Sequence, residues 1–129
     1  MKIIKQEYLI KAPIEAVWQA LIDPKIISKW GGGPVKMNDK VGEKFELWGG
    51  DIYGTNTKVI KNKKLEQDWY SDNWEKPSQV VFSLTRNNKG TKLELIHKNV
   101  PEKDLSDISD GWKTYYLGPL KELLELVMT

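Results

Sequence analysis

The apolar positions of this chain change their period repeatedly along its length. Near the start, Ile4, Tyr8 and Ile10 lie on one face of an alternating pattern, which predicts a strand over residues 3–11. The spacing then becomes helical. One apolar stripe is formed by Ile14, Val17, Trp18, Leu21 and Ile22. We therefore expect an N-terminal strand followed directly by a short amphipathic helix.

Prolines and glycines divide the helical region into two helices. Pro13 suits the first helical turn, where a missing N–H group costs nothing. Asp23-Pro24 ends this helix and begins a second one, with Asp23 as its N-cap. The second helix stops after Trp30, at Gly31-Gly32-Gly33-Pro34.

The middle of the chain has the composition and turn signals of strands. The predicted strands are Val41–Trp48, Ile52–Ile60, Leu65–Tyr70, Gln79–Thr85 and Thr91–His97. Because the turns between successive strands are short, the strands are expected to form an antiparallel meander.

The C-terminal region returns to helical spacing. Its apolar stripe consists of Leu105, Ile108, Trp112, Tyr116, Leu120, Leu123 and Val127, widened by Tyr115 and Leu124. Pro119 lacks an N–H group and its ring crowds the Tyr115 carbonyl, so a bend or local opening is expected near Tyr115. The long helix is the element able to cover the apolar face of the sheet.

The whole pattern predicts one α+β domain over residues 1–129. Its expected architecture is a six-stranded curved antiparallel sheet wrapped around a long C-terminal helix, with two short helices between strands 1 and 2.

Composition narrows the function classes. The formal net charge of +2, from 20 basic and 18 acidic residues, argues against nucleic-acid binding. No apolar run is long enough to span a membrane, and no signal peptide is recognisable. The chain has no cysteine, so we expect a cytoplasmic location, no thiolate metal site and no cysteine nucleophile. With His97 the only histidine, no metal and no cofactor is expected.

Six tryptophans and five tyrosines suggest a cavity with aromatic walls between sheet and helix. Trp30 is expected near its entrance, with access governed by the Gly31–Pro34 loop. Hydroxyl groups of Tyr8, Tyr53 and Tyr116 would orient a ligand. The predicted lining residues are Tyr8, Trp30, Phe45, Leu47, Tyr53, Trp69, Phe82, Leu84, Leu93, Trp112, Tyr115, Tyr116 and Leu120. The alternative is that these side chains fill the space and leave no cavity.

No catalytic residues can be assigned from the sequence. His97 ends a strand on the face shared with Leu93 and Leu95, which favours a hydrogen-bonded core or rim histidine. Glu43 and Gln67 share a strand face with apolar neighbours, so either could point inward, whereas most other strand polar residues, Asn56 included, are expected to face outward.

The same residues resemble a known family. Ala12-Pro13 with Val17-Trp18, Asp23-Pro24 and Trp30 are similar to the C-terminal domain of the activator of heat-shock protein 90 ATPase. Further matches are Gly42-Glu43-Lys44-Phe45, Gly49-Gly50-Asp51-Ile52-Tyr53-Gly54, Trp69, residues 80–84, residues 90–97 and Gly111-Trp112. The resemblance implies the helix-grip fold of the START-like, birch-pollen-allergen-like superfamily, also called SRPBCC.

Function is only weakly implied, since this superfamily holds carriers, enzymes and chaperone regulators. We expect binding of a small hydrophobic or aromatic molecule in the cavity. One alternative is a chaperone-regulator-like protein-interaction module, without the N-terminal docking domain of the eukaryotic co-chaperone, which has no room before Ile3. Another is a small-molecule enzyme whose acid–base residues are unidentified.

Overall fold

The computed structural model describes residues 2–71 and 74–128, and these contain a single antiparallel sheet. Its six strands lie in the order β1-β6-β5-β4-β3-β2. They are β1 (Lys2–Ile10), β2 (Lys44–Leu47), β3 (Ile52–Ile60), β4 (Lys64–Ser71), β5 (Ser78–Asn87) and β6 (Gly90–Val100). The predicted meander is confirmed for β2 to β6, and β1 closes the order by pairing with β6.

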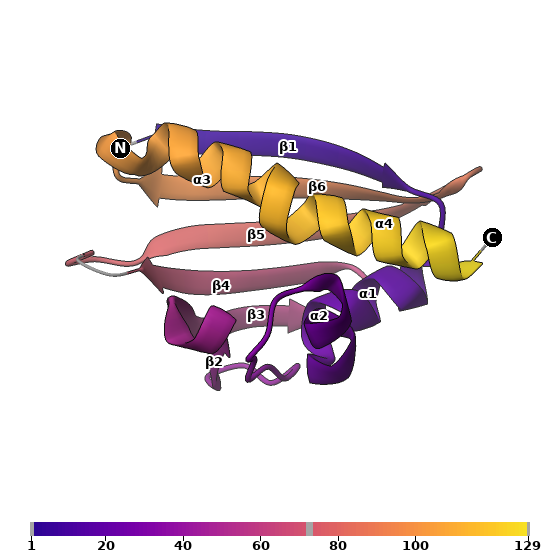
Figure 1. Ribbon diagram of the computed structural model, residues 1–129, viewed down its shortest axis with the longest axis horizontal. Coiled ribbons are helices and arrows are strands. Elements are labelled where there is room, and N and C mark those ends of the chain that lie inside the picture. Colours follow the sequence, from indigo (N-terminus) through magenta and orange to yellow (C-terminus); the bar gives the residue numbers. More distant parts are fainter. Residues whose placement is uncertain (1, 72–73, 129) are drawn as a thin grey trace.

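The helices all lie on one face of this sheet (Figure 1). α1 (Ile14–Ile22) and α2 (Pro24–Trp30) follow β1, and a 3-10 turn, Trp48–Gly50, joins β2 to β3. The C-terminal run begins with a 3-10 turn, Glu102–Asp104, and continues through α3 (Leu105–Gly111), a π-helical turn (Trp112–Tyr116) and α4 (Leu117–Met128). This long run crosses the sheet, as the sequence predicts.

The junction between the two short helices is built as expected. The Asp23 carboxylate accepts a hydrogen bond of 2.8 Å from the backbone N–H of Lys25, and Pro24 occupies the first turn of α2. Gly31 ends α2 with φ = 106°, a left-handed conformation that glycine adopts without strain. Pro13 is extended and precedes α1 by one residue rather than lying within it.

The predicted irregularity near Tyr115 is confirmed as the π-helical turn. The backbone N–H of Leu117 donates to the Trp112 carbonyl, five residues back, instead of four. Gly118 is needed here, because a Cβ atom at this position would lie 2.0 Å from the Lys113 carbonyl oxygen. The side chain of Val127, the last residue of the predicted stripe, lies outside the described residues.

Two strand predictions need correction. The strand predicted over Val41–Trp48 forms only between Lys44 and Leu47, and Glu43 lies exposed in the preceding turn. In β3 a bulge between Asn56 and Lys58 shifts the register. A bulge adds one residue and exchanges the faces of the strand, so a simple alternation through β3 fails. Before the bulge Asn56 is buried and Tyr53 faces outward, whereas beyond it Val59 packs against the core.

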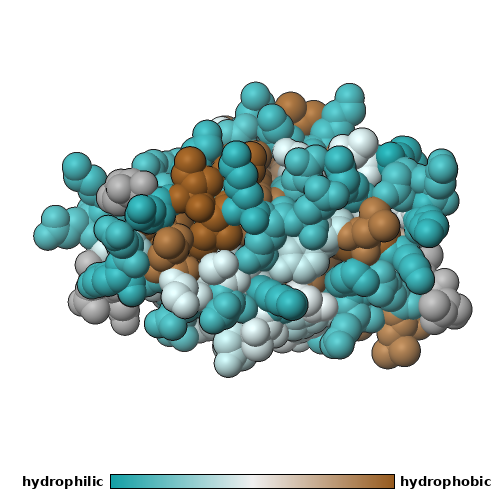
Figure 2. Space-filling model, turned by 90° about the horizontal axis from the view of Figure 1, so that it is seen from above, coloured by the Kyte–Doolittle hydropathy of each residue, from teal (hydrophilic) through white to brown (hydrophobic). Residues whose placement is uncertain are grey.

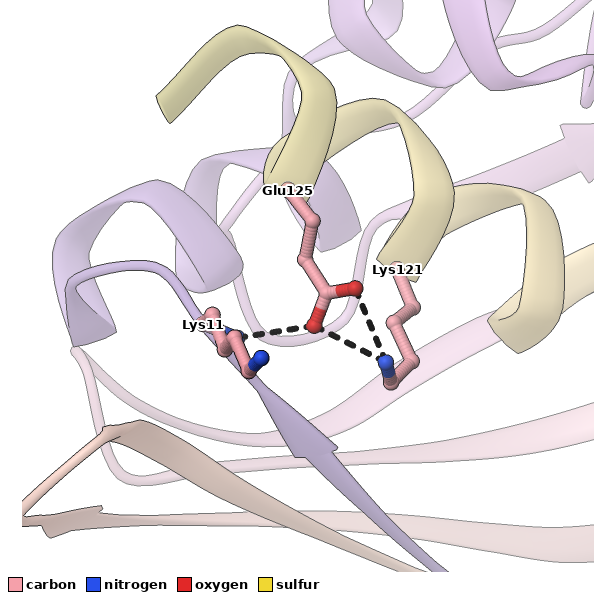
Figure 3. Close-up of polar contacts among 3 residues, drawn as sticks. All are labelled: Lys11, Lys121 and Glu125. Carbon is pink, nitrogen blue, oxygen red and sulfur yellow. Dashed lines mark hydrogen bonds and ion pairs between the residues drawn. The ribbon is translucent and has the colours of Figure 1, made fainter. Parts of the chain in front are cut away.

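The end of the C-terminal helix is tied to the end of β1 (Figure 3). Lys121 Nζ lies 2.8 Å from Glu125 Oε2, and the same oxygen accepts a 3.0 Å hydrogen bond from the backbone N–H of Lys11. These hydrogen bonds, from Lys121 first and Lys11 second, lower the pKa of the Glu125 carboxyl.

β1, one of the two edge strands of the sheet, carries exposed apolar residues that do not form a continuous apolar band. Ile3 and Leu9 are exposed on β1, with Lys5 and Glu7 between them. Viewed from the side on which β1 lies in Figure 1, the surface is mostly hydrophilic and its brown areas are separated by teal (Figure 2). Interspersed charges of this kind protect an edge strand from pairing with another chain.

Candidate functional site

Two stacked indole rings form the floor of the candidate site. Trp69 in β4 and Trp112 in the π-helical turn have ring centroids 4.7 Å apart and planes inclined by 25°. Both side chains are buried. Each indole N–H therefore needs a buried acceptor, and two hydrogen-bond networks of polar side chains supply these acceptors.

The first hydrogen-bond network begins at Trp69. Its Nε1–H donates to Gln67 Oε1 over 2.8 Å, and Gln67 Nε2 donates to Asn56 Oδ1 over 2.9 Å. Asn56 Nδ2 in turn donates to the backbone carbonyl of Asn38, 2.9 Å away. Gln67 thus points inward, as one of the two predicted candidates. Asn56 is the partner of Gln67 in the β3–β4 register, just before the bulge, so the two side chains lie on the same inward face.

The second hydrogen-bond network begins at Trp112. Its Nε1–H donates to His97 Nδ1 over 3.0 Å, and His97 Nε2 lies 2.7 Å from Ser78 Oγ. Because an indole N–H can only donate, Nδ1 is the unprotonated nitrogen and Nε2 carries the proton. Ser78 Oγ then donates to the Trp69 carbonyl, 3.3 Å away. His97 is fully buried, as the core-histidine interpretation predicts, and burial lowers its pKa to about 4.

This tautomer decides what the Ser78–His97 pair can do. A catalytic base must accept a proton from its serine, which requires a free lone pair on the nitrogen that faces the hydroxyl. Here that nitrogen already donates to Ser78 Oγ. The pair therefore holds Trp112 in place and does not activate a nucleophile.

An open pocket of about 320 Å³ lies above the stacked rings. The C-terminal helix forms one wall and the β2–β3 connection forms the opposite wall. The lining residues are Trp48, Ile52, Trp69, Asp107, Ile108, Gly111, Trp112, Tyr115 and Tyr116. The volume lies at the lower end of the range of small-molecule pockets.

Trp48 forms the wall opposite the helix in an unusual backbone conformation. Its φ is +50°, in the left-handed region that bulky residues rarely adopt. Its indole N–H donates to the Gly31 carbonyl over 2.8 Å, and its backbone N–H donates to the Gly32 carbonyl over 2.9 Å. The glycine loop thus holds Trp48 in position. Whether this loop also governs access stays a prediction.

The structure separates the predicted lining residues into several groups. Those that line the pocket are Trp69, Trp112, Tyr115 and Tyr116. Those buried in the core away from it are Trp30, Leu47, Phe82, Leu84, Leu93 and Leu120. Phe45 is buried as well, and it borders a smaller hollow of about 200 Å³ beside β2.

Three of the predicted positions require correction or comment. Trp30 does not stand at an entrance: it is buried, its ring lies 4.5 Å from that of Tyr116, and its indole donates to the Ala20 carbonyl. Tyr53 points outward and stacks at 5.4 Å on Tyr70, its partner in the β3–β4 register. Tyr8 is half-buried, and its hydroxyl donates to Gln6 Oε1 over 2.6 Å.

The hydroxyl of Tyr116 is the exception among the buried polar groups of the site. It is enclosed and has no hydrogen-bond partner among the described residues. Burial raises the pKa of this phenol.

Sequence reasoning missed five lining residues: Trp48, Ile52, Asp107, Ile108 and Gly111. Ile108 belongs to the predicted helical stripe, so the sequence places it on the apolar face of the helix. The sequence does not show that Trp48 lines the same pocket. Trp48 carried no signal, because its orientation depends on a left-handed backbone and on bonds to a loop distant in sequence.

The described residues contain neither a cluster of metal-ligating side chains nor a helix able to span a membrane. Across residues 2–71 and 74–128, no three histidine, cysteine or acidic side chains gather where they could hold a metal ion. No helix in that part of the chain has the length and apolar character needed to cross a membrane.

Sheet, helix pair and long C-terminal helix together define an α+β domain of the helix-grip class. Within this class, the chain belongs to the family described as activator of Hsp90 ATPase homolog 1-like protein, whose model matches residues 11–125.

Relatives and solved structures agree with this assignment. An activator of 90 kDa heat shock protein ATPase homolog from Dictyostelium discoideum is 34% identical over 83 residues, covering 62% of this chain and 22% of the relative. The Aha1 dimer from Colwellia psychrerythraea is 25% identical with a TM-score of 0.85, covering 98% of each chain. An HSP90 activator from Plasmodium falciparum is 27% identical with a TM-score of 0.80, covering 95% of this chain and 94% of that one. The chain spans about a third or less of the length of the curated relatives it matches.

Proposed function

We propose that this domain binds a small apolar or aromatic molecule in the pocket between the β2–β3 connection and the C-terminal helix. The pocket itself carries this proposal. Its walls are built mainly from tryptophan, tyrosine and isoleucine side chains, and it opens to the surface beside Tyr115, whose side chain is 65% exposed. Apolar walls with a few polar groups are the usual construction of ligand sites.

The rigidity of the floor supports the same proposal. Trp69 and Trp112 stack on each other, and both indole N–H groups are fixed by buried acceptors. A binding surface that is already ordered loses little conformational entropy when a ligand arrives. The pocket therefore needs no rearrangement of its floor to accept a flat ring.

Gly111 allows a direct test of the pocket. It lines the pocket in a helical conformation, and a Cβ atom added there meets nothing within 4 Å. Gly111→Leu would project a side chain into the pocket without a clash in the helix, whereas Gly111→Ala adds a single methyl group. These two variants form a matched pair.

The experiment is native mass spectrometry of protein purified from its own cells, followed by thermal-shift measurements against a panel of lipids and aromatic compounds. We expect a retained or stabilising molecule with wild type and Gly111→Ala, and none with Gly111→Leu. A ligand bound equally by Gly111→Leu would place binding elsewhere. Apoprotein throughout, with no shift across the panel, would refute the proposal.

A second candidate function is contact with a chaperone of the Hsp90 class. It is favoured by the relatives that match this chain, several of which are named as activators of 90 kDa heat shock protein ATPase. The test is ATP hydrolysis by the Hsp90 of the same organism, measured with and without the domain. An unchanged rate, together with no binding by sedimentation, would refute this candidate.

A further inference from the structure

The charge that the described lining of the pocket carries is negative. Among the lining residues that the structure describes, Asp107 is the only charged side chain, and none is a lysine or an arginine. Asp107 takes part in none of the ion pairs found within residues 2–71 and 74–128, so its carboxylate is available to a ligand. Resting on the proposed function, we propose that the ligand is an organic cation, an ammonium group attached to an apolar or aromatic body.

The aromatic walls favour a cation independently of Asp107. Trp48 is half-buried and Tyr115 is exposed, so both rings are accessible from the pocket mouth. The face of an aromatic ring carries partial negative charge and attracts ammonium groups, most strongly when the ring is tryptophan. A ligand lying over Trp69 and Trp112 would place its charged end between these outer rings and the carboxylate.

The hydrogen-bond donors of the pocket are already occupied, which disfavours an anion. The indole N–H groups of Trp48, Trp69 and Trp112 donate to Gly31, Gln67 and His97 respectively. The Tyr116 hydroxyl is enclosed. Among the lining side chains that the structure describes, only the exposed Tyr115 hydroxyl remains as a donor. A carboxylate ligand would therefore lose its hydration without gaining comparable partners.

The surroundings of Asp107 add to the negative potential. α3 carries Asp107 and Asp110, follows directly after Asp104, and contains no basic residue, while Lys103 and Lys113 flank it in the sequence. Asp104 is engaged as the acceptor of the Trp74 indole N–H, at 3.0 Å. Of these carboxylates, Asp107 is the one that lines the pocket, and an unpaired charge there raises the local concentration of ligands of opposite charge.

Three probes of similar shape separate the alternatives: benzyltrimethylammonium, its uncharged carbon analogue neopentylbenzene, and phenylacetate. Dissociation constants would be measured by calorimetry at low and high salt, with indole N–H shifts in NMR spectra locating the site. We expect the cation to bind roughly tenfold more tightly than the uncharged analogue. Phenylacetate is expected to bind most weakly.

Asp107→Asn tests the carboxylate, with Asp110→Asn as the matched control on the same helix. Asp107→Asn should weaken cation binding roughly threefold, as expected for an exposed charge pair. It should leave the uncharged analogue unaffected, and added salt should remove the difference. Asp110→Asn should weaken cation binding by less than Asp107→Asn does, and it too should leave the uncharged analogue unaffected.

The outcomes distinguish this inference from the proposed function. Equal affinity for the cation and the uncharged analogue, unchanged by Asp107→Asn, would overturn the inference and leave a pocket that binds apolar molecules. Tightest binding of phenylacetate would also overturn it. Binding of none of the three, with no indole shift, would overturn the inference and count against the proposed function as well.

Discussion

The two halves of the C-terminal helix lie on the same sheet but make different contacts. In the second half, α4, Leu117 and Leu120 are fully buried and the helix packs against α1, α2 and β1. In the first half, α3 has no buried residue, and the following turn buries only Trp112 and Tyr116. The open pocket lies beside this first half.

The difference has a simple structural cause. The helix pair α1–α2 lies under the α4 end of the long helix, whereas at the α3 end only the short β2–β3 connection stands opposite (Figure 1). That connection contributes the single side chain of Trp48, together with Ile52 at the start of β3. One indole cannot fill the space that two helices fill at the other end, so a pocket remains.

Truncating one apolar residue in each half gives the largest expected effect. Leu120 is fully buried in the closed half, and Leu120→Ala should lower the free energy of unfolding by about 2–5 kcal/mol. Ile108 is half-exposed beside the pocket, so Ile108→Ala should lower it by less than about 1 kcal/mol. Urea unfolding of both variants measures the contrast. Similar losses at the two positions would show that the pocket is closed in solution.

The open half should be sensitive to acid through His97. Burial lowers the folded-state pKa from 6.5 to about 4, so between these values the unfolded chain binds more protons than the folded one. The contribution of His97 to the free energy of unfolding is therefore fully present above about pH 6.5. It decreases by about 3 kcal/mol in total as the pH falls toward 4.

The control for this prediction is His97→Gln, which cannot titrate but retains a side-chain amide that can donate. The quantity to measure is the difference between the unfolding free energies of wild type and variant at each pH, because this difference removes the contribution of the carboxyl groups. A difference that stays constant between pH 7 and pH 4 would contradict a buried neutral His97. Near-ultraviolet circular dichroism should report the accompanying change around Trp112.

Two glycines of the long helix should respond in opposite directions to alanine. At Gly118, in the closed half, the new Cβ atom would meet the Lys113 carbonyl at 2.0 Å, so Gly118→Ala should lower the free energy of unfolding by about 1–3 kcal/mol. At Gly111, beside the pocket, the Cβ atom has free space, so Gly111→Ala should raise it by roughly 0.5–1 kcal/mol. Thermal unfolding of the pair suffices, and a gain at both positions would show that the π-helical turn is not required.

The fold was largely predictable from sequence because each element carries its own local signal. Asp23-Pro24 marks the junction of α1 and α2, and Pro119 marks the irregular turn before α4. The pocket was only partly predictable. The helix side followed from the stripe that contains Trp112 and Tyr116, but the opposite wall depends on a left-handed Trp48 and on bonds to a distant loop. Tyr53 was misplaced because it shares its parity with Val59, and the bulge between them, which periodicity does not detect, puts the two side chains on opposite faces.

Tyr116 lies at the boundary between the two halves, and its hydroxyl is expected to lower the stability of the fold slightly. The group is enclosed without a partner among the described residues, and an unsatisfied buried hydroxyl is unfavourable. Tyr116→Phe should therefore raise the free energy of unfolding by about 1 kcal/mol, measured by urea unfolding. The exposed Tyr115 provides the control, since Tyr115→Phe should leave stability unchanged. A loss of stability in Tyr116→Phe would mean that the hydroxyl bonds to an enclosed water molecule, and the boundary between the halves would then be hydrated rather than dry.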